Sequence, residues 1–138
     1  MSSLDMPALN DNAQEDYDGI LKSNAANVFS EPDPDKRMAA LHSLWAADGV
    51  LIEREAVSTG YAAISSSVGA LLGMLPPGTT FVPEGTGAGH HGLSRLRWRA
   101  TSANGEPVGV YGTDLAFLSD GRIQRLYVIL DPQVSTGS

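Results

Sequence analysis

Two adjacent histidines, His90 and His91, have the side chains best suited to acid–base chemistry here, because an imidazole changes its charge near neutral pH. His90 shares the even-numbered positions of Trp98, so we expect it to point toward the apolar side of the following strand as a general acid or base. The alternative is a loop histidine at the rim of a pocket, since its glycine neighbours leave its orientation loose. We expect no metal site, because adjacent histidines in a strand diverge and no third ligand follows at a recognisable spacing.

The segment that contains these histidines, Gly87-Ala88-Gly89-His90-His91-Gly92, satisfies the pattern GxGxxG. In dinucleotide-binding proteins this pattern follows a strand and opens a helix, so that the helix N-terminus meets the pyrophosphate. Here the pattern leads into a strand. We therefore interpret it as a flexible pocket rim, and we expect no cofactor.

Three helices are predicted in the first half of the chain, where they would position any site. Apolar residues recur at helical spacing from residue 15 to residue 29. Asp33 is a suitable N-cap, with Pro34 at the first position of a second helix that includes Trp45 and ends at Asp48-Gly49. Thr59 or Gly60 caps a third helix, which is stopped by Pro76-Pro77-Gly78.

The strands are predicted from apolar and β-branched runs bounded by turn residues. Residues 50–53 form a short strand, and residues 79–83 form another, at a sheet edge because of Pro83. Residues 92–131 form three strands joined at Asn104-Gly105 and Asp120-Gly121, sequences that favour two-residue type I′ turns. This order indicates an α+β domain over residues 15–132, with a mostly antiparallel sheet curled over the helices and with tails at residues 1–14 and 133–138.

Counting outward from two-residue turns assigns the residues of the last three strands to faces. The predicted ligand-binding residues combine the inward face with two residues from the first half of the chain: Trp45, Leu51, Leu96, Trp98, Tyr111, Leu115, Phe117, Leu126 and Val128. Thr113 points inward with them, and Asp114 becomes a salt-bridged residue of the outer face. The inward aromatic rings either stack on a flat ligand or simply form the core. A one-residue bulge would invert this assignment.

Composition excludes several classes of partner. The net charge is −7, from 9 basic and 16 acidic residues, whereas a nucleic-acid surface depends on clustered Lys and Arg. No apolar run approaches the roughly 18 residues of a membrane span. The chain has no cysteine, which fits a reducing compartment, and its first residues lack the basic and apolar regions of a secretory signal. We expect a cytoplasmic protein that binds neither nucleic acid nor membrane.

Several short stretches, taken in order, resemble the nuclear transport factor 2-like superfamily and, within it, the SnoaL-like proteins. The stretches are Leu44-Trp45-Ala46-Ala47-Asp48-Gly49-Val50, Gly60-Tyr61-Ala62-Ala63-Ile64, Arg97-Trp98-Arg99-Ala100, Gly112-Thr113-Asp114, Asp120-Gly121-Arg122-Ile123 and Leu130-Asp131. The resemblance implies a cone: a strongly bent sheet around three helices, with a pocket at the wide end and frequent dimers through the outer face. Members include ketosteroid isomerases, polyketide cyclases, dehydratases and limonene epoxide hydrolase, among which fold similarity alone does not choose.

By this resemblance, Glu53 falls where ketosteroid isomerases place their catalytic base, at the end of the first strand. Beside Leu51 on a pocket wall, its carboxylate would have a pKa raised by desolvation, which suits proton transfer near neutral pH. The alternative is a solvated glutamate in the charged run of residues 53–55. Thr113 falls at the position of the isomerase's protonated aspartic acid, where a hydroxyl is a weaker donor to an oxyanion.

Two further departures from the family narrow the chemistry. Tyr17 lies too early in the first helix to match the tyrosine of the isomerase oxyanion site. Val128 stands where the epoxide hydrolase needs an aspartate, so epoxide hydrolysis by that mechanism is not expected.

We therefore predict an enzyme that transfers protons, by isomerisation, cyclisation or dehydration, on a small hydrophobic molecule, with Glu53 as base and His90 or Thr113 assisting. The alternatives are a non-catalytic module that binds a hydrophobic metabolite and, on the shared fold alone, a protein-interaction adaptor. We also predict a homodimer through the outer sheet face, where paired charges face a twin surface: Arg95, Arg97, Asp114, Arg125 and Tyr127.

Overall fold

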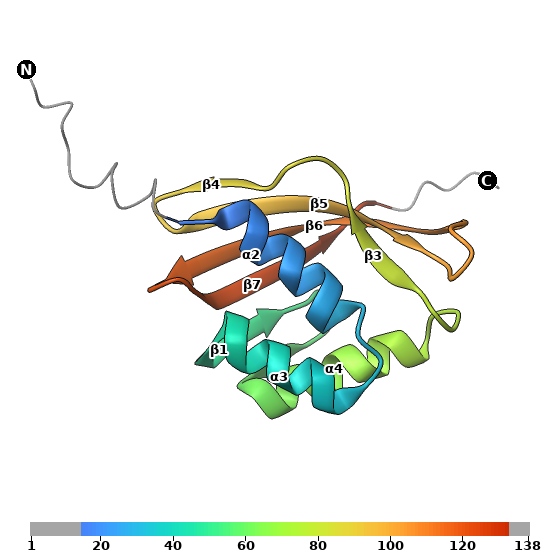
Figure 1. Ribbon diagram of the computed structural model, residues 1–138, viewed down its shortest axis with the longest axis horizontal. Helices are drawn as coiled ribbons and strands as arrows, with labels where there is room; N and C mark the ends of the chain where they lie inside the picture. The colour runs from blue at the N-terminus through green and yellow to red at the C-terminus, as the bar shows by residue number, and fades with distance from the viewer. Residues whose placement is uncertain (1–14, 133–138) are drawn as a thin grey trace, which may run out of the picture.

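The computed structural model describes residues 15–132, so the two predicted tails lie outside the described residues. Its elements are α2 (Tyr17–Asn24), the π-helical segment η2 (Ala25–Phe29), α3 (Pro34–Leu44), β1 (Trp45–Ile52), β2 (Val57–Thr59), α4 (Tyr61–Gly73), β3 (Thr80–Pro83), β4 (Ala88–His90), β5 (Leu93–Thr101), β6 (Pro107–Ser119) and β7 (Arg122–Leu130). Figure 1 shows these helices and the sheet. Within residues 15–132, three α-helices and an open, mostly antiparallel sheet confirm the predicted α+β fold.

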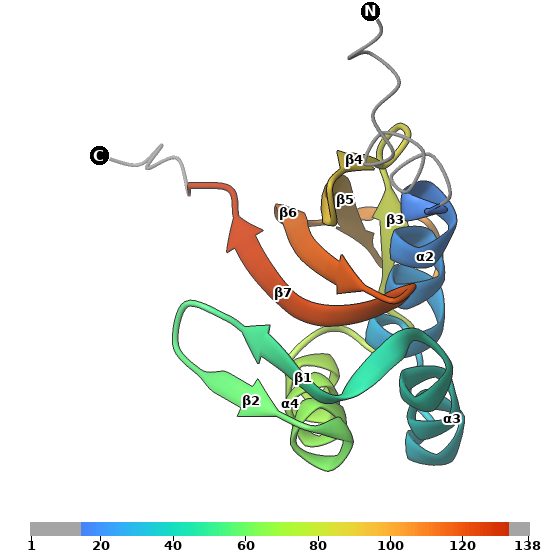
Figure 2. The same cartoon turned by 90° about the vertical axis from the view of Figure 1, so that its left-hand side faces the viewer.

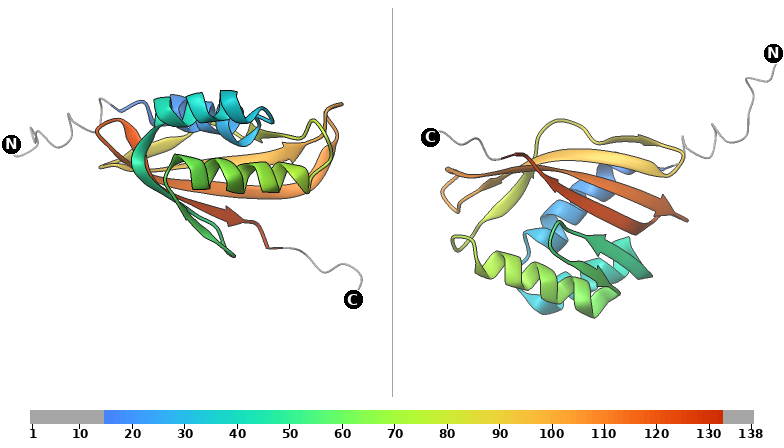
Figure 3. Two further views of the ribbon diagram at one scale, coloured as in Figure 1. Left: turned by 90° about the horizontal axis from the view of Figure 1, so that it is seen from below. Right: turned by 180° about the vertical axis from the view of Figure 1, so that it is seen from behind.

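One sheet holds all the strands of the described residues, in the order β2-β1-β7-β6-β5-β3, with β4 paired to β5. The pairing of β1 with β7 is parallel, and the other pairings are antiparallel. β3, which ends in Pro83, lies at an edge, as predicted. Figure 2 shows the long curvature of β7, and Figure 3 shows α3 and α4 side by side.

Local sequence explains where the helices begin. The Asp16 side chain accepts a hydrogen bond from the Gly19 amide at 3.0 Å and so caps α2. Asp33 accepts from the Asp35 amide at 2.9 Å, with Pro34 in the first turn, which confirms the predicted cap of α3. α4 follows Gly60, whose φ of 89° is readily adopted only by glycine.

Four features of the secondary structure differ from the prediction. The second helix ends at Leu44, and Trp45 has extended backbone angles and opens β1, because a buried residue at this spacing suits a strand as well as a helix. The first helix is not uniform, since α2 continues into the π-helical η2. β2 was not predicted, and neither was β4, which includes His90 and forms from the glycine-rich segment by pairing with β5.

The connection between β5 and β6 differs from the predicted two-residue turn. Thr101 pairs with Pro107, and residues 102–106 form a loop in which the Ser102 amide donates to the Glu106 carbonyl at 2.8 Å. The register then shifts, so that Trp98 pairs with Gly112 rather than with Tyr111.

The turn at Asp120-Gly121 is confirmed, with positive φ angles of 54° and 74° at its two residues. A bulge follows between Phe117 and Leu118, so that Phe117 pairs with Arg125. These two shifts invert the predicted faces of β6 but leave those of β5 and β7 unchanged. The inward placement of Tyr111, Thr113, Leu115 and Phe117 is therefore wrong, and so is the outward placement of Asp114.

The core lies between the helices and the concave face of the sheet. Leu21 of α2, Leu41 of α3 and Ile64 of α4 are fully buried against strand residues that include Trp45 and Leu126. Burying each such side chain stabilises the fold by about 1.5–3 kcal/mol. Among the described residues, none of the helices combines the length and the apolar character that crossing a membrane requires.

Candidate functional site

The helices and the concave face of the sheet enclose a cavity of about 440 Å³. Its walls are mostly apolar and come from η2, α4, β3 and the last three strands, with contributions that include Ala25, Phe29, Leu71, Phe81, Trp98 and Val128. Exposed lining residues, among them Met74 and Leu130, mark its mouth, together with the β1–β2 turn. The cavity is large enough for a small organic molecule.

One carboxyl group, that of Asp114 in β6, lies in this apolar wall. The residue is 5% exposed, and the Trp98 indole Nε1 donates a hydrogen bond to its Oδ1 at 2.9 Å. Burial raises the pKa of Asp114 to about 7, and the hydrogen bond from Trp98 opposes that rise. Because both protonation states are populated near neutral pH, this carboxyl group can exchange a proton there.

The strand register explains why Asp114 is buried. Asp114 pairs with Leu96 of β5 and with Val128 of β7, so it occupies the centre of the sheet. Its same-face neighbours along β6, Gly112 and Ala116, are both buried. Small side chains on either side leave the carboxyl group room beside the cavity.

A second carboxylate, Glu53, lines the cavity from the turn that follows β1. The turn is closed by a hydrogen bond of 2.8 Å from the Glu53 amide to the Ala56 carbonyl. Ser67 of α4 donates its hydroxyl to Glu53 Oε1 at 2.8 Å, which orients the half-buried side chain. The structure thus places Glu53 beside the cavity, while its action as a base stays a prediction.

The other two predicted catalytic residues lie outside the cavity. His90 is exposed in β4, where its Nδ1 is 3.0 Å from Nδ1 of His91, and it lies beside a separate depression of about 270 Å³. Thr113 faces the outer surface because the register of β6 is shifted. The predictions that His90 and Thr113 enter the pocket are therefore wrong.

The predicted ligand-binding residues divide into three groups. Trp98 and Val128 line the cavity. Four others, which are fully buried in the core, do not line it: Trp45, Leu51, Leu96 and Leu126. The remaining three lie on the outer face: Tyr111, Leu115 and Phe117. Sequence reasoning missed Asp114, and it also missed the aromatic wall formed by Phe29 and Phe81.

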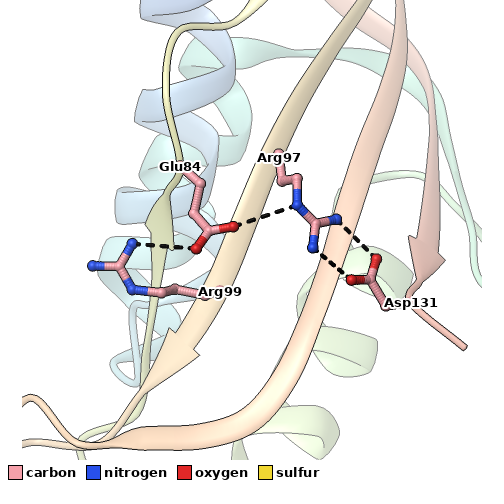
Figure 4. Close-up of polar contacts among 4 residues, drawn as sticks. All are labelled: Glu84, Arg97, Arg99 and Asp131. Atoms are coloured by element: carbon pink, nitrogen blue, oxygen red, sulfur yellow. Dashed lines mark hydrogen bonds and ion pairs between the residues drawn. The ribbon is translucent and has the colours of Figure 1, made fainter. Parts of the chain in front are cut away.

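The outer face of the sheet carries a second polar cluster, drawn in Figure 4. Arg97 donates from its two terminal nitrogens to the two oxygens of Asp131, at 2.8 and 2.5 Å, and its Nε lies 3.4 Å from Glu84 Oε1. Arg99 lies 3.6 Å from Glu84 Oε2. The hydrogen bonds from Arg97 hold the pKa of Asp131 below its usual value. Arg97 is thus paired within its own chain, and Asp114 is absent from the face predicted for dimerisation.

Comparison with known proteins finds relatives of this fold among solved structures. No family model matches the sequence, and neither does any curated protein. A SnoaL-like family protein from Agrobacterium tumefaciens, provisionally assigned as an isomerase, is 28% identical, with a TM-score of 0.76 over 84% of this chain and 97% of that one. A protein from Sinorhizobium meliloti, provisionally assigned as a polyketide cyclase, is 21% identical, with a TM-score of 0.61 over 93% and 99% of the two chains. An NTF2-like protein of unknown function from Mesorhizobium loti is 28% identical, with a TM-score of 0.52 over 70% and 79%.

The bent sheet, the helices on its concave face and the enclosed cavity define an α+β protein of the cone type. The chain has the fold of the nuclear transport factor 2-like superfamily, and it is similar to a SnoaL-like member of that superfamily.

Proposed function

We propose that this chain catalyses proton transfer on a small hydrophobic molecule bound in the cavity, in an isomerisation, cyclisation or dehydration. One observation carries the proposal: a buried carboxyl group, Asp114, with a pKa of about 7 in an otherwise apolar wall. The similarity to a SnoaL-like protein provisionally assigned as an isomerase supports the same class of reaction.

In this proposal, the substrate packs against the aromatic wall while its reacting carbon faces Asp114. Phe29 and Phe81 exclude water, so electrostatic interactions with the carboxylate are stronger than in bulk solvent. Ionised Asp114 removes a proton from carbon and returns it at another position. Glu53, oriented by Ser67 near the entrance, serves as a second carboxylate that accepts or delivers a proton.

A second candidate function, binding without catalysis, is favoured by the scarcity of hydrogen-bond donors in the cavity. Trp98 donates to Asp114, and Ser67 donates to Glu53. Tyr17 is not among the described lining residues, and its hydroxyl accepts a hydrogen bond from the Gly92 amide at 2.9 Å. A developing oxyanion would therefore depend on water or on the exposed Arg54 for stabilisation.

Hydrogen–deuterium exchange on a hydrophobic ketone tests the proposal. The probe is 2-tetralone, whose hydrogens next to the carbonyl are weakly acidic, incubated with the protein in deuterium oxide and followed by proton NMR. We expect the wild-type protein to accelerate exchange, with a midpoint near the pKa of about 7 given for Asp114. Asp114→Asn should reduce the rate about 100-fold or more.

Asp131→Asn is the matched control, because it makes the same chemical change on the outer face. Equal exchange rates in wild type and Asp114→Asn would overturn the assignment of Asp114. Binding of 2-tetralone without accelerated exchange would favour the non-catalytic alternative.

A further inference from the structure

We infer that Gly112 is a positioning residue for Asp114: because it lacks a side chain, it leaves the space in which the Trp98 indole reaches the Asp114 carboxyl group. The inference rests on the proposed function, in which Asp114 is the group that exchanges protons. It assigns a role to a residue that contacts neither the substrate nor the proton.

The space above Gly112 is occupied by the indole. Trp98 of β5 and Gly112 of β6 are directly opposite each other in the sheet. A Cβ atom at Gly112 would lie 2.5 Å from Trp98 Cζ2 and 2.9 Å from Cη2, closer than side-chain carbons approach one another. The six-membered ring of the indole therefore lies across the backbone of β6, where any other residue would displace it.

Backbone conformation does not require glycine at this position. The glycines with positive φ in the described chain include Gly105 and Gly109 but not Gly112. Gly112 adopts an ordinary strand conformation inside a strand, where glycine otherwise costs stability. What distinguishes the position is close approach, to the indole and to the Ile129 carbonyl oxygen, which would lie 2.9 Å from an added Cβ.

The position of the indole fixes the carboxyl group. Asp114 follows Gly112 by two residues and so lies on the same face of β6, within reach of the Nε1 of Trp98. The Phe81 ring contacts the same indole edge-to-face, with 5.1 Å between ring centroids. Displacing the ring from Gly112 would move its N–H away from Oδ1 and leave the buried carboxyl group free to rotate.

Few other groups can replace this hydrogen bond. The charged residues of the described cavity lining are Glu53, Arg54 and Glu55 of the β1–β2 turn, besides Asp114 itself. The lining residues from η2, α4, β3, β5 and β7 are uncharged. Trp98 is therefore the donor that opposes the rise of the Asp114 pKa on burial.

The two tryptophans of the chain allow this contact to be followed by NMR. In the ¹⁵N-labelled full chain, the Trp98 indole N–H signal should shift with pH, with a midpoint near the Asp114 pKa of about 7. Trp45 is an internal reference, because its Nε1 donates to the neutral amide oxygen of Asn24 at 2.8 Å. Trp98→Phe assigns the two signals. Two indole signals that are both independent of pH would overturn the inference.

Gly112→Ala should weaken the hydrogen bond and raise the midpoint of the Asp114 carboxyl titration, followed by ¹³C NMR, by about one pH unit. Gly73→Ala is the matched control, since nothing lies within 4 Å of the added Cβ, and its titration should equal that of wild type. In the exchange assay, Gly112→Ala should lower kcat more than it raises KM. An unchanged carboxyl titration in Gly112→Ala would overturn the inference.

A double-mutant cycle separates the indole contact from the contact with Ile129. In the Trp98→Phe background, Gly112→Ala should not shift the carboxyl titration further, because the indole is absent while the Ile129 carbonyl remains. Equal shifts in both backgrounds would overturn the inference. If Gly112→Ala does not fold, folding of the double variant supports it, and failure of both to fold overturns it. These titrations do not require catalytic activity, so they test the role of Gly112 even if the proposed catalysis is not observed.

Discussion

Asp114 and Asp131 carry the same carboxyl group on opposite faces of one sheet, and the two faces move its pKa in opposite directions. Asp114 is buried beside the cavity and accepts one hydrogen bond from a neutral indole, so its pKa rises to about 7. Asp131 lies on the outer face with Arg97 on both of its oxygens, so its pKa falls. The two residues show that the pKa of a carboxyl group on this sheet depends on whether its side chain faces the cavity or the paired arginine of the outer surface.

The largest expected effect is the pH dependence of the free energy of unfolding that results from the burial of Asp114. Between about pH 4 and pH 7 the unfolded chain ionises this residue while the folded chain keeps it protonated, so wild-type stability falls as pH rises. The loss is roughly 4 kcal/mol and is complete above the folded-state pKa. Asp114→Asn should not show this loss. The difference in free energy of unfolding between the variant and wild type should therefore shift in favour of the variant as the pH rises to about 8. Parallel curves from urea unfolding across this range would contradict the burial of an ionisable Asp114.

Glu53 is a third carboxylate to compare with Asp114 and Asp131, and its side chain is half-buried at the cavity mouth. Glu53→Gln should lower the 2-tetralone exchange rate by about 10-fold or more if it shares the proton transfer, and Ser67→Ala should lower it less, since it only frees the side chain. Glu106→Gln is the control, because its exposed carboxylate lies in the loop of residues 102–106 and does not line the cavity. Full exchange in Glu53→Gln would leave Asp114 as the sole acid–base group.

The outer face offers a third test, since we propose that it forms a homodimer. It exposes Phe117, Tyr127 and Ile129 beside the predicted contact residues Arg95 and Arg125. Ile129→Asp places a charge among these exposed apolar side chains and should weaken dimerisation by about 10-fold or more, measured by light scattering across a concentration series.

Val57→Asp is the control for this test, because it makes the same kind of change at an exposed side chain on β2, an edge strand of the sheet. Wild-type protein with only monomer mass at micromolar concentration would exclude the dimer.

The smallest effect is expected at Asp131. Because its pKa is lowered in the folded state, its contribution to stability is present above the usual aspartate pKa and is lost as the pH falls through the folded value. Asp131→Asn should therefore lower Tm slightly at neutral pH and not at all in strong acid. High salt should reduce the difference, since the pair with Arg97 is exposed. A difference that is unaffected by pH and salt would show that charge pairing is not its cause.

The sequence predicts the elements of this fold better than it predicts their register. The cap at Asp33, the turn at Asp120-Gly121 and the edge strand at Pro83 follow from local chemistry, and each is found. The register depends on a bulge at Phe117 and on the loop at residues 102–106, which no local signal marks. Because β6 has apolar residues at both parities, its pattern could not reveal the error.

The error in the register of β6 also explains why only part of the site was predicted. The resemblance placed Glu53 beside the cavity, and β5 and β7 were assigned correctly, so Trp98 and Val128 line it. Asp114 was missed because a single register step moves it from one face to the other. Phe29 lines the cavity from η2, and the pattern of residues 15–29 predicts a continuous helix rather than a π-helical end.

The parallel pairing of β1 with β7 has a consequence for the order of events during synthesis. Trp45 and Ile123 are partners, so the inner edge of β1 has no neighbour until almost the whole sheet has been translated. The cavity, which needs the strands of both halves, can form only at that late stage. Such long-range pairing is typical of domains that fold on the order of milliseconds to seconds, and it leaves one edge of β1 without a partner while the ribosome finishes the chain.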